Sequence, residues 1–93
     1  MEVKFSIVLH PLVISQDIPV LDVFWRGEIR DVIRSKLTTA PELFGKPLRQ
    51  SLAGHRVLRV SDYRIVYRIE RPVVNVIAIF HRSTKYRGIE RRT

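Results

Sequence analysis

The sequence predicts an α+β domain, in which a small antiparallel sheet of one N-terminal and three C-terminal strands carries helices on one face. Three observations predict it: a short alternating segment near the N-terminus, an amphipathic helical segment after it, and three strand-like segments joined by tight turns. The 93 residues suffice for one hydrophobic core but not for two, so we expect residues 1–93 to form a single domain.

The N-terminal half contains the first strand and the helix. Lys4 and Ser6 alternate with apolar residues over residues 3–9, a pattern typical of a strand. A helix is expected next, with Asp22 as its candidate N-cap. Its apolar positions recur at three- and four-residue spacing: Leu21, Trp25, Ile29, Val32, Ile33 and Leu37. Pro41 ends the helix, because the residue before a proline avoids the α region.

The C-terminal half is expected to be mostly sheet. Residues 41–49 are predicted to form a loop that is anchored by Leu43, Phe44 and Leu48. The predicted strands are residues 55–60, 63–70 and 73–80, with turns at Ser61-Asp62 and Arg71-Pro72. The alternation in the second of these places Arg64 and Arg68 on the face that the helices leave open. The basic tail, residues 81–93, is expected to fray.

Charge is distributed unevenly along the chain, whose net charge is +8. Residues 1–45 contain five basic and six acidic residues, whereas residues 46–93 contain twelve basic and three acidic residues. A half-domain with this imbalance repels itself, so an anionic partner is expected. Nucleic acid is the first candidate, an acidic protein the second and an anionic membrane surface the third. The alternative, that charge only keeps the protein soluble, requires no such asymmetry.

Several classes of protein are excluded. The chain has no cysteine, which removes disulfide and thiolate chemistry and fits a reducing compartment. No apolar run reaches about 18 residues and the N-terminus lacks a secretory layout, so we expect a cytoplasmic protein without a membrane partner. His10, His55 and His81 have no cysteine or carboxylate at metal-ligand spacing. Glycine-rich phosphate loops and nucleophile elbows are also missing, so no metal or cofactor is expected.

Cations and a tyrosine gather near the ends of the last strands. Arg64 begins one strand and Arg82 ends its neighbour, so the two ends meet in an antiparallel pair. Tyr86 follows four residues later, and His55 and Arg59 share one face of the preceding strand. Arginine binds phosphate bidentately and keeps its charge at any working pH, which predicts an anion site. Taken singly, such an arginine is a solvated charge and such a tyrosine a half-buried packing residue.

Several segments resemble the RelE/ParE toxin superfamily of type II toxin–antitoxin systems. They are LFGKPL (43–48), LAG (52–54), LRVSDYRIVYRI (58–69) and HRSTKY (81–86). The resemblance covers the C-terminal half, and the order of strand, helices and strands extends it along the chain. It implies a RelE-like, microbial-ribonuclease-type fold and a ribosome-dependent endoribonuclease, an mRNA interferase that cuts mRNA in the decoding site.

The resemblance also implies a mechanism without a metal. The 2′-hydroxyl of the RNA attacks the adjacent phosphorus and leaves a 2′,3′-cyclic phosphate. Arg64 would hold the scissile phosphate, Arg82 would stabilise the leaving side, and Tyr86 would stack on a base or help to activate the hydroxyl. Further RNA contacts are expected from five cations: Lys46, Arg49, Arg56, Arg59 and Lys85.

One departure from the family pattern affects proton transfer. Members usually carry basic residues at two alternate positions before the Tyr-Arg hairpin, and these positions are His55 and Val57 here. Valine supplies no cation, so one is lost unless Arg56 or Arg59 replaces it. His55 is a candidate general base, because imidazole has an unperturbed pKa of about 6.5. The alternative is that His55 simply sits beside Gly54 at the start of the strand.

The resemblance implies partners and leaves two other functions open. The expected partners are mRNA, the ribosome and an acidic antitoxin that covers the cationic half, with DNA contacted only through the antitoxin. One alternative is a ParE-like toxin that poisons DNA gyrase by protein contact, although such proteins tend to lack the arginine-tyrosine set. The other is a non-catalytic RNA-binding module, which needs only a basic face and aromatic residues.

Overall fold

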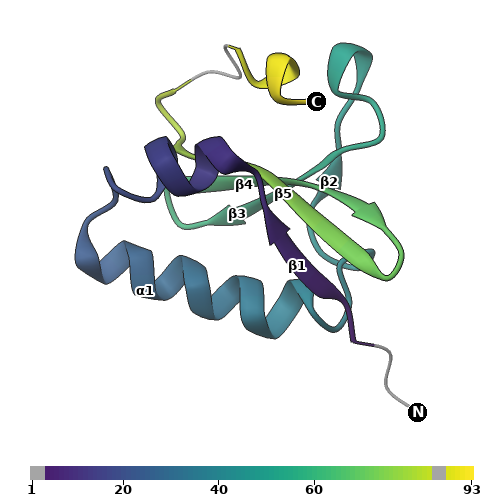
Figure 1. Ribbon diagram of the computed structural model, residues 1–93, viewed down its shortest axis with the longest axis horizontal. Coiled ribbons are helices and arrows are strands. Elements are labelled where there is room, and N and C mark those ends of the chain that lie inside the picture. The colour runs from purple at the N-terminus through teal and green to yellow at the C-terminus, as the bar shows by residue number, and fades with distance from the viewer. Residues whose placement is uncertain (1–3, 85–87) are drawn as a thin grey trace.

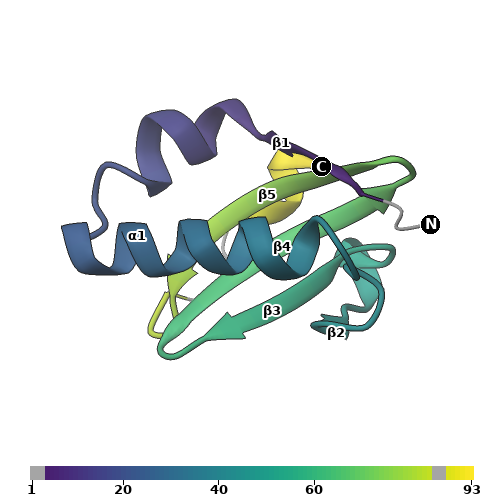
Figure 2. The ribbon, with the colours of Figure 1, turned by 90° about the horizontal axis from the view of Figure 1, so that it is seen from below.

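The computed structural model describes residues 4–84 and 88–93, which form a sheet with a long helix across one face (Figures 1 and 2). The strands are β1 (Ser6–Leu9), β2 (Lys46–Pro47), β3 (Arg56–Val60), β4 (Tyr63–Glu70) and β5 (Val73–His81). The helical elements are η1 (Val13–Asp17), α1 (Val23–Val32), η2 (Ile33–Leu37), η3 (Gln50–Leu52) and η4 (Ile89–Arg92). None of the helices in the described part of the chain has the length and apolar content to span a bilayer.

The sheet has the strand order β1-β5-β4-β3-β2. The three predicted C-terminal strands and both of their turns are confirmed, and these strands pair antiparallel. The N-terminal strand departs from the prediction, because β1 pairs parallel with β5, with Ser6 opposite Val73 and Leu9 opposite Val76. The predicted loop over residues 41–49 also contains a fifth strand, β2, which adds two residues to the edge of β3.

The helix begins and ends where the sequence predicts. The side chain of Asp22 accepts a hydrogen bond from the Phe24 N–H at 2.7 Å, which confirms the N-cap. The helix α1 continues directly into the wider turn η2, and Thr38 follows as its C-cap. Its buried side chains, Ile29 in α1 and Ile33 and Leu37 in η2, lie on the predicted apolar face.

The main core lies between this helix and the sheet. Its buried members on the strands include Leu58, Ile65, Tyr67 and Val76. Of the predicted loop anchors, Phe44 packs against this core, whereas Leu43 is 82% exposed and is no anchor. The third, Leu48, packs against a second cluster on the other face of the sheet.

The second cluster covers the middle of the face opposite the helix. It comprises Leu52, Val66, Ile77, Ala78 and Ile89. A bulge in β5 makes it continuous: Tyr67 pairs with Val76 and Val66 with Ala78, which leaves Ile77 as an extra residue. The expectation of an open face around Arg64 and Arg68 is therefore wrong for its centre, which η3 and η4 cover, and right only toward its ends.

The C-terminal residues pack instead of fraying. The side chain of Ile89 is buried, and Arg92 makes an ion pair with Asp17 at 2.6 Å in which both side chains are largely buried. Arg92 also donates to the Ile77 carbonyl at 3.1 Å, and Asp17 accepts from the Ile79 N–H at 2.9 Å. These bonds hold the bulge and tie η1 and η4 to it. The part of the predicted tail at 85–87 lies outside the described residues.

Candidate functional site

Three cations gather on the face opposite the helix, where β2, β3 and β4 lie side by side. Arg59 and Arg64 are direct cross-strand partners, and Lys46 stands beside Val57 on the neighbouring strand. These residues line a shallow cavity of about 320 Å³ together with Gly45, Val57 and Leu58, and none of the described residues that line it is a carboxylate. Because like charges directly opposite each other are destabilising, this arrangement favours the binding of an anion.

The turns hold Arg64 and Arg82 at the same end of the sheet. Tyr63 pairs with His81 and Arg64 with Phe80, so the predicted meeting of the two strand ends is confirmed. Arg64 donates from Nη1 to the carbonyls of Ser61 and Tyr63 at 3.1 and 3.0 Å. The Arg82 N–H donates to the Asp62 carbonyl at 2.6 Å, and its Nε lies 3.4 Å from the Asp62 carboxylate.

Two of the predicted cations lie apart from this end of the sheet. Arg49 is exposed at the start of η3 and does not line the cavity. Arg56 points to the helix side, where its Nε and Nη2 donate to the carbonyls of Phe44 and Gly45 at 3.2 and 3.0 Å. Arg56 therefore does not replace the cation missing at Val57. Lys46, the cross-strand partner of Val57, brings a charge to that position from the adjacent strand.

His55 is buried and does not line the cavity that holds Arg59 and Arg64. It lies four residues before Arg59, on the order of 13 Å along an extended chain. Its side chain is 4% exposed, and its Nδ1 has no hydrogen-bond partner among the described residues. Nothing in this geometry brings the imidazole to a phosphate held by Arg64 and Arg82. The remaining predicted residues, Lys85 and Tyr86, lie outside the described residues.

A hydroxyl buried beneath the site fixes the loop that carries Lys46. The Tyr67 hydroxyl donates to the Pro41 carbonyl at 2.7 Å and also contacts the Phe44 carbonyl. Burial raises the pKa of Tyr67, and the neighbouring Arg56 opposes that rise. A Cβ at Gly45, where φ is +73°, would lie 2.8 Å from both this hydroxyl and the Val57 carbonyl, so only glycine fits the turn into β2.

Sequence reasoning missed the role of His81 at this end. Its Nδ1 lies 2.9 Å from the Ser83 hydroxyl and accepts from the Ser83 N–H at 3.2 Å. Its ring lies 5.3 Å from the ring of Tyr63, which in turn lies 5.5 Å from Trp25. The sequence contained a signal for this pairing, because Tyr63 and His81 each immediately precede one of the two arginines and therefore lie at the same end of the sheet.

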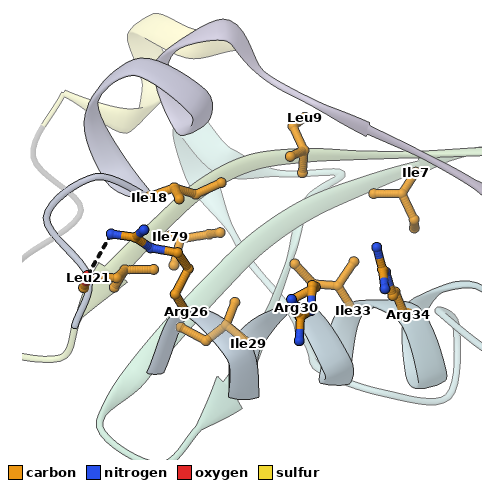
Figure 3. A pocket seen from close by; sticks show the side chains of 10 residues that line it. All are labelled: Ile7, Leu9, Ile18, Leu21, Arg26, Ile29, Arg30, Ile33, Arg34 and Ile79. Atoms are coloured by element: carbon orange, nitrogen blue, oxygen red, sulfur yellow. Dashed lines mark hydrogen bonds between the residues drawn. The ribbon is translucent and has the colours of Figure 1, made fainter. Parts of the chain in front are cut away.

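A second feature, an apolar groove of about 440 Å³, lies on the helix side between β1, η1 and α1 (Figure 3). Its apolar lining comprises Ile7, Leu9, Ile18, Leu21, Ile29, Ile33 and Ile79. Arg26, Arg30 and Arg34 line its helical side at four-residue intervals, which places them on one side of the helix. This groove is separate from the cationic end of the opposite face.

The structure describes no site built for a metal. Within residues 4–84 and 88–93, no three His, Cys, Asp or Glu side chains stand close enough to hold an ion.

Comparison with known proteins identifies the family. Residues 25–86 match the family described as the ParE toxin of the type II toxin–antitoxin system, parDE. Since this match covers more than half of the chain, the protein belongs to that family, within the RelE/ParE superfamily that its sequence resembles. The family is one of toxins of type II toxin–antitoxin systems.

Two curated relatives come from Mycobacterium tuberculosis. The chain is 43% identical over 53 residues to a protein named Toxin RelE, an alignment that covers 55% of each chain. It is 42% identical over 53 residues to Toxin RelG, covering 55% of this chain and 61% of that protein. The chain thus spans little more than half the length of the curated relatives it matches.

Two solved structures share the fold. The toxin–antitoxin complex RelBE2 of Mycobacterium tuberculosis matches with a TM-score of 0.80 and 26% identity, covering 88% of this chain and 95% of that chain. A conserved hypothetical protein of Helicobacter pylori, HP0894, matches with a TM-score of 0.63 and 14% identity over 85% of this chain and 96% of that one. The second likeness shows the fold alone. Together they confirm the RelE-like α+β fold.

Proposed function

We propose that this toxin cleaves mRNA on the ribosome and that the cationic end of the sheet holds the scissile phosphate. The observation that carries the proposal is the direct pairing of Arg59 with Arg64, with Arg82 at the same end and Lys46 beside them. A phosphate between these groups would relieve their mutual repulsion. The names of the two curated relatives give further support to a RelE-type activity.

The chemistry requires no nucleophile from the protein. The 2′-hydroxyl of the RNA loses its proton and attacks the adjacent phosphorus, the bond to the 5′-oxygen breaks, and that oxygen takes up a proton. Arg64 and Arg82 would stabilise the charge that develops on the phosphorane oxygens and on the leaving oxygen. Holding the RNA in line contributes as much as charge, because little else is required of the protein.

The proton-transfer groups are fewer than the sequence predicted. His55 is buried and does not line the cavity of Arg59 and Arg64, so we assign it no proton transfer. Tyr86 remains a proposed contributor, in stacking or in activation of the 2′-hydroxyl.

Primer extension on mRNA from a translating extract tests the proposal. We expect cuts at the codon in the decoding site, each ending in a 2′,3′-cyclic phosphate. Intact mRNA together with inhibited gyrase supercoiling would instead support the ParE-type activity that the family name suggests. Salt-sensitive RNA binding without cleavage would support a non-catalytic module.

We also propose an acidic antitoxin as the protein partner. The structural match to a toxin–antitoxin complex supports this class of partner, and the net charge of +8 gives it a physical reason to bind. The groove beside α1 fits an apolar segment of that partner flanked by carboxylates, which Arg30 and Arg34 would pair with (Figure 3).

Charge reversal at the groove tests the partner proposal. Arg30→Glu combined with Arg34→Glu should weaken co-purification with a co-expressed antitoxin, while mRNA cleavage by the free toxin persists. Lys36→Glu, on the same helical segment but outside the groove lining, is the matched control. Equal co-purification of both variants would contradict docking in the groove.

A further inference from the structure

Four aromatic rings form a connected row at the end of the sheet that carries Arg64 and Arg82. Phe24 and Trp25 stand at the start of α1, Tyr63 starts β4, and His81 ends β5. Successive ring centroids lie 5.1, 5.5 and 5.3 Å apart. We call these four residues the aromatic strip. Figure 2 shows the start of α1 and the β3–β4 turn at the same end of the molecule.

The strip is accessible and is not fully used in packing. Phe24, at the outer end of the strip, is 62% exposed, and the other three side chains are partly exposed. The rings of Trp25 and Tyr63 are tilted by 42°, so they do not cover each other's faces. Phe24 leaves the most apolar area in water of the four, and a stacked ring would cover it.

The strip is continuous with the candidate phosphate site. Tyr63 and His81 are cross-strand partners, and each immediately precedes one of the two arginines. Since successive residues of a strand point to opposite faces, the rings and the cations lie on the two sides of one sheet end. A single strand of RNA held at Arg64 and Arg82 reaches the rings by passing around that end.

We propose that the aromatic strip is a stacking surface for unpaired nucleobases next to the phosphate held by the arginines. This inference rests on the proposed function for its ligand, and it adds a base-binding site on the other side of the sheet end. Single-stranded nucleic acid is recognised by aromatic faces beside cations, which is the combination found here. Stacking is tolerant of sequence, so the strip would hold the strand without reading it.

The charged groups around the strip carry both signs. Asp22 accepts from the Phe24 N–H, and Asp62 is paired with Arg82 at 3.4 Å. Glu28 is an exposed carboxylate on the helical face of Phe24, whereas Arg26 donates to the Leu21 carbonyl at 3.1 Å and lines the groove. The positive charge that would hold an anionic strand therefore comes from the phosphate site at the end of the sheet and not from the helix.

The experiment uses Trp25, the single tryptophan of the chain, as the reporter. The probe is a short 2′-O-methyl oligouridylate, which cannot be cut because it lacks the attacking hydroxyl. We expect it to quench the fluorescence of Trp25 on binding, with an affinity that fluorescence anisotropy of the labelled oligonucleotide reports independently. Phe24→Ala should weaken that affinity by roughly tenfold, the loss expected for one stacked base.

Leu43→Ala is the matched control, because Leu43 is an apolar residue outside the strip that is at least as exposed as Phe24. Binding with unchanged Trp25 emission and equal affinity in both variants would overturn the proposal, as would an absence of binding to the wild-type protein. Emission that responds only to a protein partner would also overturn it and assign the strip to protein docking.

The proposed ribonuclease function fails by a different measurement. If ribosome-bound mRNA stays intact while the oligonucleotide still quenches Trp25, the stacking surface stands and the cleavage proposal falls. If mRNA is cut equally by wild type and Phe24→Ala and the oligonucleotide does not quench, the cleavage proposal stands and the strip falls.

Discussion

The two faces of the sheet differ in what occupies them. On the helix side, apolar side chains from three strands meet one continuous helical stripe, and the polar Tyr67 hydroxyl is fully bonded. On the opposite side, the apolar cluster is smaller and confined to the centre, and Arg59, Arg64 and Lys46 stand beyond it. Most of the apolar burial therefore lies on the helix side of the sheet, and the opposite face carries the unpaired cations of the cavity.

The largest expected effect follows from removing one cation from the face opposite the helix. Arg64→Ala should lower mRNA cleavage by about 100-fold or more, the loss typical of one group that stabilises developing charge. Its thermal unfolding should change little, because the side chain is half-exposed and bonds only to turn carbonyls. Arg68→Ala, on the same strand and face but exposed outside the cavity, should leave cleavage intact. Equal losses would contradict the site.

The second prediction concerns the ion pair of Asp17 and Arg92, which is largely buried although most of the burial lies on the helix side. Arg92→Ala should lower the free energy of unfolding by about 3 kcal/mol, because it leaves the largely buried Asp17 without its cation. Chemical denaturation measures this. Arg91→Ala, an exposed neighbour, should cost little. The double variant Asp17→Leu with Arg92→Met removes both charges and should recover most of the stability that Arg92→Ala loses. If it does not, the hydrogen bonds to the bulge contribute more to stability than the ion pair does.

The third prediction tests the helix side through pH. The pKa of Tyr67 is raised above the value of 10.0 that the unfolded chain would show. Its contribution to stability is therefore fully present below pH 10.0 and is lost as pH rises through the folded pKa. Unfolding experiments should show a loss of stability at alkaline pH that Tyr67→Phe reduces. At neutral pH the same variant should cost about 1–3 kcal/mol, because the Pro41 carbonyl loses its donor.

The smallest expected effect is at Lys46. Lys46→Ala should weaken binding of single-stranded RNA uniformly across sequences and reduce the salt slope by about one. Lys36→Ala, whose ammonium lies 5.1 Å from the Phe44 ring on the helix side, should leave the slope unchanged. A slope that falls equally in both variants would mean that RNA contacts both faces.

Much of the fold was predictable because local patterns and tertiary packing agree. The helix stripe, the Asp22 cap and the alternation of β4 each follow from periodicity, and the structure confirms them. The parallel pairing of β1 was not predictable from these patterns, because periodicity defines a strand but not its neighbour. The packing of the last residues was not predictable for a similar reason. It depends on the ion pair of Asp17 and Arg92, which are distant in sequence.

The site was predictable only in part. The meeting of Arg64 and Arg82 follows from strand order and turn length, which the sequence contains. His55 and Arg56 were assigned from a family pattern that says nothing of burial, and the structure places one in the interior and the other on the helix side. The contribution of Lys46 at Val57 depends on a two-residue strand that is too short to produce a periodic signal.

The extra residue in β5 has an evolutionary consequence. Ile77 shifts the phase of the strand, so the residues after it point to the opposite faces from those that regular alternation would give them. Because Ile77 is the extra residue, its loss would leave a regularly alternating strand in which Ala78 and Phe80 keep their faces and their partners on β4. A strand that closed the bulge but retained the residue would instead turn Ala78 and Phe80 toward the helix. Descendants of this gene can therefore lose one residue at position 77 without changing the strand pairing, at the cost of one apolar side chain in the second cluster.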